Sequence, residues 1–152
     1  MTNQEVWNFL KAGKGKKRKL EELDLQLKQL EEGENYIKAI DYEKPTVSGG
    51  TTSDLSSIVA QQEEAAKRLK KSIIETTKEI LWWKNEVLAM TRFCNNDVQA
   101  GILIAKFVNE KSWKEIQKEY RYSESQPYVI CRQAVAEIAN KYKPANKEHR
   151  KQ

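Results

Sequence analysis

The chain has 152 residues and a formal net charge of +5, with 32% charged and 39% hydrophobic residues. This composition suits extended helices with a narrow apolar stripe better than one large core, and it predicts an all-α protein. Apolar runs stay well short of the ~18 residues that a membrane span needs, and the N-terminus lacks a signal-peptide core. We therefore expect a soluble, cytoplasmic protein that has no membrane partner.

The N-terminal half of the chain shows the pattern of a coiled coil. Leucines and an isoleucine recur at spacings of three and four between Leu20 and Ile37, which predicts a helix over residues 17–39. The Gly- and Lys-rich residues 13–19 before it predict a flexible hinge. Residues 41–57 contain Pro45 and several Gly, Ser and Thr residues, so we expect a loop there, with Ser53 and Asp54 capping the next helix.

A longer helix is predicted from Leu55 to Cys94. A strict four-three alternation runs through this segment, and only Gln62 and Thr76 in the seam are not apolar. Because a short loop precedes it, this helix should pack antiparallel against the leucine seam before the loop. The apolar stripe broadens at Leu81, Trp82 and Phe93, which indicates either docking of the C-terminal domain or self-association.

The remaining sequence predicts a small three-helix domain over residues 95–143. Asn95–Asp97 should cap a helix over residues 98–108, and residues 109–111 should form a loop. Trp113, Ile116 and Tyr120 then share one helical face. We accordingly divide the chain into a helical hairpin or coiled coil (1–94), a helix-turn-helix domain (95–143) and a basic, flexible tail (144–152).

The last helix of this domain follows the turn at Tyr122–Ser123. Ser123 and Gln126 have the spacing of a capping box. Pro127, however, disfavours helical geometry at the residue before it, so the helix could instead begin nearer Ser125 with Pro127 in its first turn. The buried stripe of this helix should consist of Ile130, Ala134, Val135 and Ile138.

The positive charge of the chain is concentrated near its C-terminus. Eleven Lys and Arg residues oppose six Asp and Glu residues from Lys106 onward, whereas the first 105 residues balance. This asymmetry is expected of a module that touches phosphates, although lysine-rich helices are also simply soluble.

The segment FVNEKSWKEIQKEYRYSESQPYVICRQAV resembles the fourth region of bacterial sigma factors. The whole layout, with an acidic leucine-rich helix, a Ser/Gly loop after Lys38-Ala39-Ile40 and a long central helix, is similar to phage-encoded sigma-like late-gene regulators of the RinA and ArpU kind. The resemblance implies a sequence-specific, DNA-binding transcriptional regulator acting in a bacterial host cell. The sequence departs from the family pattern at two positions. The family usually has Gly where this chain has Arg121, and it has an apolar β-branched residue where this chain has Pro127.

On this interpretation the polar face of the last helix meets double-stranded DNA. Base edges would be read by Ser125, Gln126, Tyr128 and Arg132. The DNA backbone would be held by Lys111, Lys114, Lys118, Arg121 and Gln133.

Other functions stay open at this point. The coiled coil could be the working part of a scaffold or an RNA-polymerase-binding factor, with self-association through the long helix, or the chain could be a small phage packaging (terminase) subunit. A three-helix unit with a merely solvated polar face is the plainest alternative. An enzyme is least expected, because the sole histidine, His149, lies in the tail and no nucleophile–base pair, phosphate loop or metal-ligand cluster occurs. We expect no cofactor and no metal.

Cys94 and Cys131 should be buried free thiols.

Overall fold

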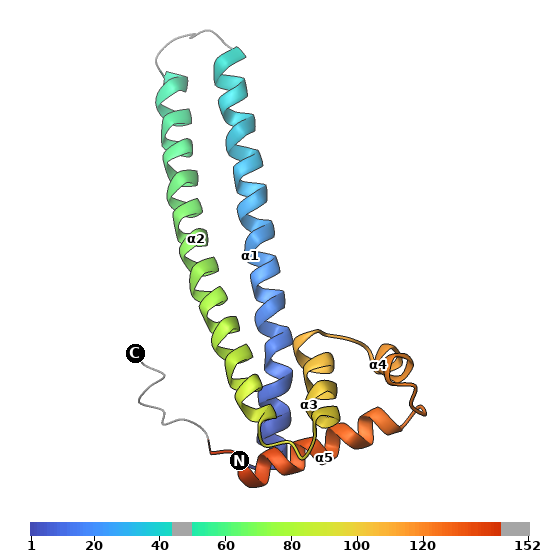
Figure 1. Cartoon of the computed structure of the whole chain (residues 1–152). Coiled ribbons are helices and arrows are strands. Elements are labelled where there is room, and N and C mark those ends of the chain that lie inside the picture. The colour runs from blue at the N-terminus through green and yellow to red at the C-terminus, as the bar shows by residue number, and fades with distance from the viewer. Residues whose placement is uncertain (44–49, 144–152) are drawn as a thin grey trace. The chain divides into compact units, whose positions relative to one another are not determined.

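The structure is a computed structural model that describes the backbone of residues 1–43 and 50–143 and the side chains of residues 1–33 and 55–143. The described residues form an all-α fold, as the composition predicts (Figure 1). The elements in chain order are α1 (Asn3–Glu43), α2 (Gly50–Thr91), α3 (Asp97–Leu103), the π-helix η1 (Ile104–Val108), α4 (Trp113–Tyr120) and α5 (Gln126–Lys141). The expected tail at 144–152 lies outside the described residues.

Packing divides the chain into two units, and each contains parts of both long helices. Residues Lys17–Glu79 form one unit, and Met1–Lys16 forms the other together with the chain from Ile80 onward. The division therefore differs from the one expected at residue 94. The reason is that the first turns of α1 and the last turns of α2 contribute apolar side chains to the core of the C-terminal helices.

The unit of residues 17–79 is the predicted antiparallel helical hairpin (Figure 1). None of the described seam side chains in either helix is exposed, and Ala66 and Thr76 are buried. A Cβ atom built on Gly33 of α1 would lie 3.9 Å from Gln62 Nε2 of α2, so the Gln62 side chain reaches the α1 backbone there. The four-three spacing thus identified the packed face of both helices.

Two predicted interruptions of the long helices are wrong. The hinge at residues 13–19 does not form, because α1 is continuous from Asn3 to Glu43. The loop at 41–57 is shorter than expected, because α2 already begins at Gly50, and Ser53 and Asp54 lie inside that helix rather than capping it. Extending an existing helix adds one hydrogen bond for each residue fixed, so α1 and α2 run through weak helix formers. The intervening residues 44–49 lie outside the described residues.

Gly13 has a packing role in place of the predicted hinge role. A Cβ atom at this position would lie 2.2 Å from Trp83 Cζ2 on α2, far closer than van der Waals contact. The fully buried Trp83 indole also donates a hydrogen bond of 2.8 Å from Nε1 to the Phe9 carbonyl oxygen. The absence of a side chain at Gly13 therefore lets the indole lie directly on the α1 backbone.

The second unit has a single core that all of its helices share. Val6 and Leu10 from α1 and Trp83, Val87 and Met90 from α2 join one buried cluster with residues of the C-terminal helices: Ile102, Leu103, Ala105, Ile116, Cys131, Ala134, Val135, Ile138 and Tyr142. Of the residues that broaden the stripe on α2, Phe93 packs on this core, as docking of the C-terminal helices requires. Leu81 and Trp82 remain exposed. Buried residues of α3, α4 and α5 all belong to this cluster, as expected for three packed helices.

The helix expected over residues 98–108 is divided into α3 and η1. Asn96 caps α3 as predicted, since its side-chain oxygen accepts a 2.9 Å hydrogen bond from the Gln99 amide. From Ile104 the ladder widens, and the Asn109 amide donates to the Ile104 carbonyl at 2.9 Å, an i to i+5 bond. Periodicity could not predict this widened turn, because a π-helix shifts the side-chain register by about one residue.

Candidate nucleic-acid interface

The first helix of the predicted helix-turn-helix is fixed at both ends by local hydrogen bonds. Ser112 is its N-cap, and its hydroxyl accepts a 3.2 Å hydrogen bond from the Glu115 amide. At the other end Arg121 is in the left-handed region, with φ 56° and ψ 44°. This is the position where glycine is usual, because a Cβ atom is disfavoured there. Arg121 thus forms the turn at some conformational cost.

Helix α5 begins later than the capping-box pattern indicates. The Ser123 and Gln126 side chains form no capping box, and the Gln126 amide instead donates to the Ser123 carbonyl at 3.2 Å. Ser125 is the N-cap residue and Pro127 lies in the first turn, which confirms the alternative start. First-turn amides have no partner within a helix, so the missing donor of Pro127 costs little. Its ring is fully buried and anchors the start of the helix on the core.

Four of the predicted contact residues share the outward face of α5. Ser125 and Arg132 are seven residues apart, as are Gln126 and Gln133, and all four are exposed. Val129 lies between the two pairs and is 44% exposed. We call these five residues the reading face. Its guanidinium, amide, hydroxyl and methyl groups are of the kinds that contact base edges in a major groove.

Tyr128, also predicted to read bases, is turned to the edge of this face by two tryptophans. Its ring stacks on Trp7 with centroids 6.3 Å apart, and it meets Trp113 edge-on at 5.7 Å. The ring is 46% exposed. A base contact by Tyr128 would therefore have to be made by the part of the ring outside this aromatic cluster.

The predicted backbone contacts are dispersed around α4. Lys114, Lys118 and Arg121 are exposed. Lys111 instead forms a 2.6 Å ion pair with Glu119, and this hydrogen bond raises the pKa of the Lys111 ammonium. A phosphate contact by Lys111 would have to replace that pair.

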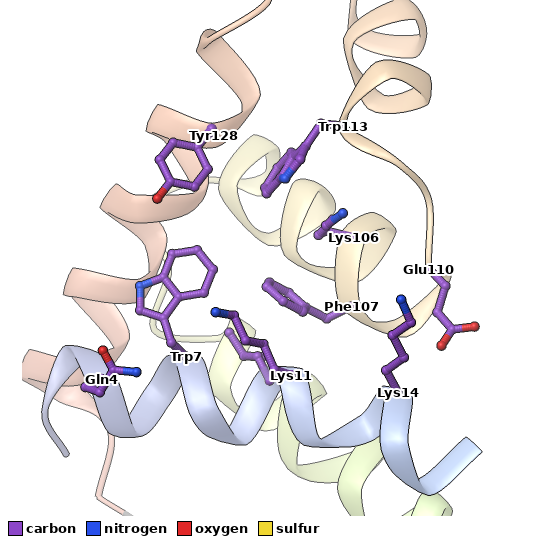
Figure 2. Close-up of a pocket in the computed structure, with 10 residues that line it drawn as sticks. Gln4, Trp7, Lys11, Lys14, Lys106, Phe107, Glu110, Trp113 and Tyr128 are labelled. Carbon is purple, nitrogen blue, oxygen red and sulfur yellow. The ribbon is translucent and has the colours of Figure 1, made fainter. Parts of the chain in front are cut away.

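The structure places the N-terminus of α1 beside the reading face, which the sequence did not predict. A shallow hollow of about 390 Å³ is lined by Asn3, Trp7, Val129, Arg132, Gln133 and Ala136. A second hollow of about 800 Å³ lies between α1, η1, α4 and Tyr128 (Figure 2). Gln4, Trp7, Lys11 and Lys14 of α1 line it at helical spacing, and none of them is among the site residues that the sequence predicted.

Neither cysteine is arranged for chemistry. Burial raises the pKa of the Cys94 thiol to about 11 and that of Cys131 to about 12. Both cysteines are free, as expected, but only Cys131 is buried, and Cys94 is half-buried. Among the described residues no group of three His, Cys, Asp or Glu side chains could hold a metal ion. None of the described helices combines the length and apolar composition of a membrane span.

Comparison with protein-family models, with curated proteins and with solved structures finds no match.

Proposed function

We propose that the protein is a sequence-specific DNA-binding regulator of transcription, of the kind that controls phage late genes. The observation that carries this proposal is the reading face of α5, an exposed polar surface set on a packed core by α4 and the tight turn at Arg121. A recognition helix needs this combination of a rigid support and an outward face of hydrogen-bonding side chains. The positive charge that follows residue 105 would attract the phosphate backbone.

The central test is duplex selection followed by substitution of the reading face. The full chain is used to enrich sequences from a random duplex library at low salt, and affinity for the enriched duplex is measured by fluorescence anisotropy. Arg132→Ala should weaken binding about 5- to 150-fold, the range for loss of one bidentate base contact, and should relax the preference at one base pair.

Arg68→Ala is the matched control, because Arg68 lies in the hairpin unit and its side chain is 80% exposed. It removes the same charge away from α5 and should leave affinity unchanged. A library that enriches no sequence, or equal affinities for the two variants, would contradict the proposal.

A second candidate function is association through the coiled coil. Leu81 and Leu88 lie seven residues apart on α2 within the second unit, and they expose 54% and 48% of their surface. Exposed apolar residues at heptad spacing favour a further helix as their partner. That helix could belong to a second copy of this chain or to another protein such as RNA polymerase. Sedimentation equilibrium tests the homo-oligomer. The wild-type protein should self-associate and the Leu81→Lys variant should be monomeric, whereas a monomeric wild type would exclude the homo-oligomer.

A further inference from the structure

The larger hollow has the size and the chemistry of a ligand site. Its volume of about 800 Å³ falls within the usual range for small-molecule pockets. It lies wholly inside the second unit and is built from α1, η1, α4 and α5 (Figure 2). We call it the aromatic pocket, because four rings line it: Trp7, Phe107, Trp113 and Tyr128.

The rings of the aromatic pocket cover only part of one another's surfaces. Trp7 meets Phe107 edge-on at 5.9 Å, and Trp113 meets Tyr128 edge-on at 5.7 Å. Trp7, Phe107 and Trp113 are half-buried and Tyr128 is exposed, so parts of all four rings still face the hollow. Partly exposed aromatic faces from four different elements form a surface on which a planar group can stack.

The same pocket carries an excess of positive charge. Lys11, Lys14 and Lys106 line it together with a single acidic residue, Glu110. The Lys106 Nζ atom lies 4.7 Å from the centroid of the Trp113 ring, and Lys11 Nζ lies 5.5 Å from that of Trp7. Within the part of the chain that the structure describes, neither Lys11 nor Lys14 pairs with a carboxylate. Cationic groups therefore stand directly beside the aromatic surfaces, and an anion bound to them would adjoin a stacked ring.

The backbone on one side of the pocket is irregular in a way that is common at functional sites. Lys106 and Phe107, neighbours in sequence, both line the pocket from the π-helix η1. Glu110, in the loop that follows, has a φ of 54°, which is costly for a residue with a Cβ atom. Single-turn π-helices and left-handed backbone occur preferentially where a fold positions side chains for binding.

We propose that the aromatic pocket binds a nucleotide. The base stacks on the Trp113 ring, and the Tyr128 ring, at 82° to that of Trp113, contacts the edge of the base. The phosphate lies against Lys11, Lys14 and Lys106. A planar ring joined to an anion matches both halves of the lining, whereas an apolar ligand would leave the three ammonium groups without a counter-charge. This site goes beyond the proposed duplex contact on α5. A free nucleotide and an unpaired nucleotide of a DNA strand share the required chemistry.

Isothermal titration calorimetry of the full chain tests the site. The four deoxynucleoside monophosphates and a single-stranded pentanucleotide are titrated beside two partial ligands, a deoxynucleoside and inorganic phosphate. At least one nucleotide ligand should bind tenfold or more tightly than either partial ligand. Tighter binding of the pentanucleotide identifies a DNA strand as the source, and tighter binding of a monophosphate identifies a free nucleotide. Equal or absent binding of all ligands would overturn the proposal.

Variants then locate the bound nucleotide. Trp113→Ala should weaken binding about tenfold, as for other stacked bases, and circular dichroism checks its folding, because Trp113 also packs on the core. Lys14→Gln alters only an exposed side chain and should weaken binding at least threefold, whereas the matched control Lys71→Gln, exposed on the hairpin unit, should not. Equal affinities for Lys14→Gln and Lys71→Gln would overturn the site even if a nucleotide binds elsewhere.

The two proposals fail separately. Duplex binding that depends on Arg132 without nucleotide binding overturns the pocket alone. Nucleotide binding that depends on Lys14 without duplex selection supports the pocket and contradicts the proposed function.

Discussion

Replacing Gly13 with alanine tests the close packing of Trp83 on α1 in the second unit. The added Cβ atom would lie 2.2 Å from Trp83 Cζ2, so the indole must move away from α1. Forcing an extra methyl into a packed core costs about 1–3 kcal/mol. The displaced indole also lengthens or loses its hydrogen bond to the Phe9 carbonyl, which is worth about 1 kcal/mol. Alanine regains about 1 kcal/mol of helix propensity over glycine.

The balance predicts that Gly13→Ala lowers the free energy of unfolding by about 1–3 kcal/mol. Gly15 provides a matched control two residues away in the same helix, because a Cβ atom there meets no heavy atom within 4 Å. Gly15→Ala should therefore stabilise the protein by about 1 kcal/mol. Urea unfolding followed by circular dichroism at 222 nm measures both variants. If Gly13→Ala is as stable as Gly15→Ala, the close packing of Trp83 on α1 is incorrect.

Three further substitutions or titrations test other features. Arg121→Gly should raise the free energy of unfolding by about 1 kcal/mol, because it removes the Cβ atom from a left-handed residue, whereas Arg121→Ala should give no gain in the same urea assay. Gln62→Leu should raise the midpoint of thermal unfolding, because the Gln62 Oε1 atom is buried without a hydrogen-bond partner among the described residues. An unchanged or lower midpoint would show that this atom has a hydrogen-bond partner. The Cys131 thiol, with its pKa raised to about 12, should resist Ellman's reagent at pH 8 until the protein unfolds, and rapid native labelling would contradict its burial. Since the unfolded thiol ionises from its ordinary pKa of 9.0, the contribution of Cys131 to stability should fall as pH rises above 9.0, and Cys131→Ala should reduce that fall in a urea titration across pH 8–10.

Periodicity predicted the helices and their buried faces well. None of the seam residues from Leu55 to Cys94 is exposed. In the stripe predicted for α5, Ala134, Val135 and Ile138 are buried and Ile130 is half-buried. These positions follow from local sequence, because a helix places residues three and four apart on the same side. Helix ends and glycine roles were predicted less well. Gly13 looks like a hinge in sequence, and only the position of Trp83, 70 residues later, reveals that its missing side chain makes room for an indole.

The part of the candidate interface that lies within one helix was predicted from residue spacing, and the part that depends on contacts between distant segments was not. Exposure of Ser125, Gln126, Arg132 and Gln133 follows from spacing within one helix. The position of Tyr128 does not, because its partner Trp7 comes from the other end of the chain. Counting charges along the sequence likewise missed the aromatic pocket. Lys11 and Lys14 belong to the first 105 residues, whose net charge is zero because acidic residues balance the basic ones. In the structure, α1 brings these two side chains into the second unit, where they line the pocket.

The shared core has a consequence for how the helix-turn-helix could act. A fragment cut at the expected boundary of residue 94 would keep α3, α4 and α5 but lose Val6, Leu10, Trp83, Val87 and Met90, which are the α1 and α2 side of the buried cluster. A helical unit of this size is only marginally stable even with a complete core, so the loss of this side of the cluster should destabilise the fragment. The reading face of α5 therefore depends on the ends of the two long helices. The DNA affinity that we propose for this face should respond to substitutions such as Gly13→Ala, which lies in α1 and outside both α4 and α5.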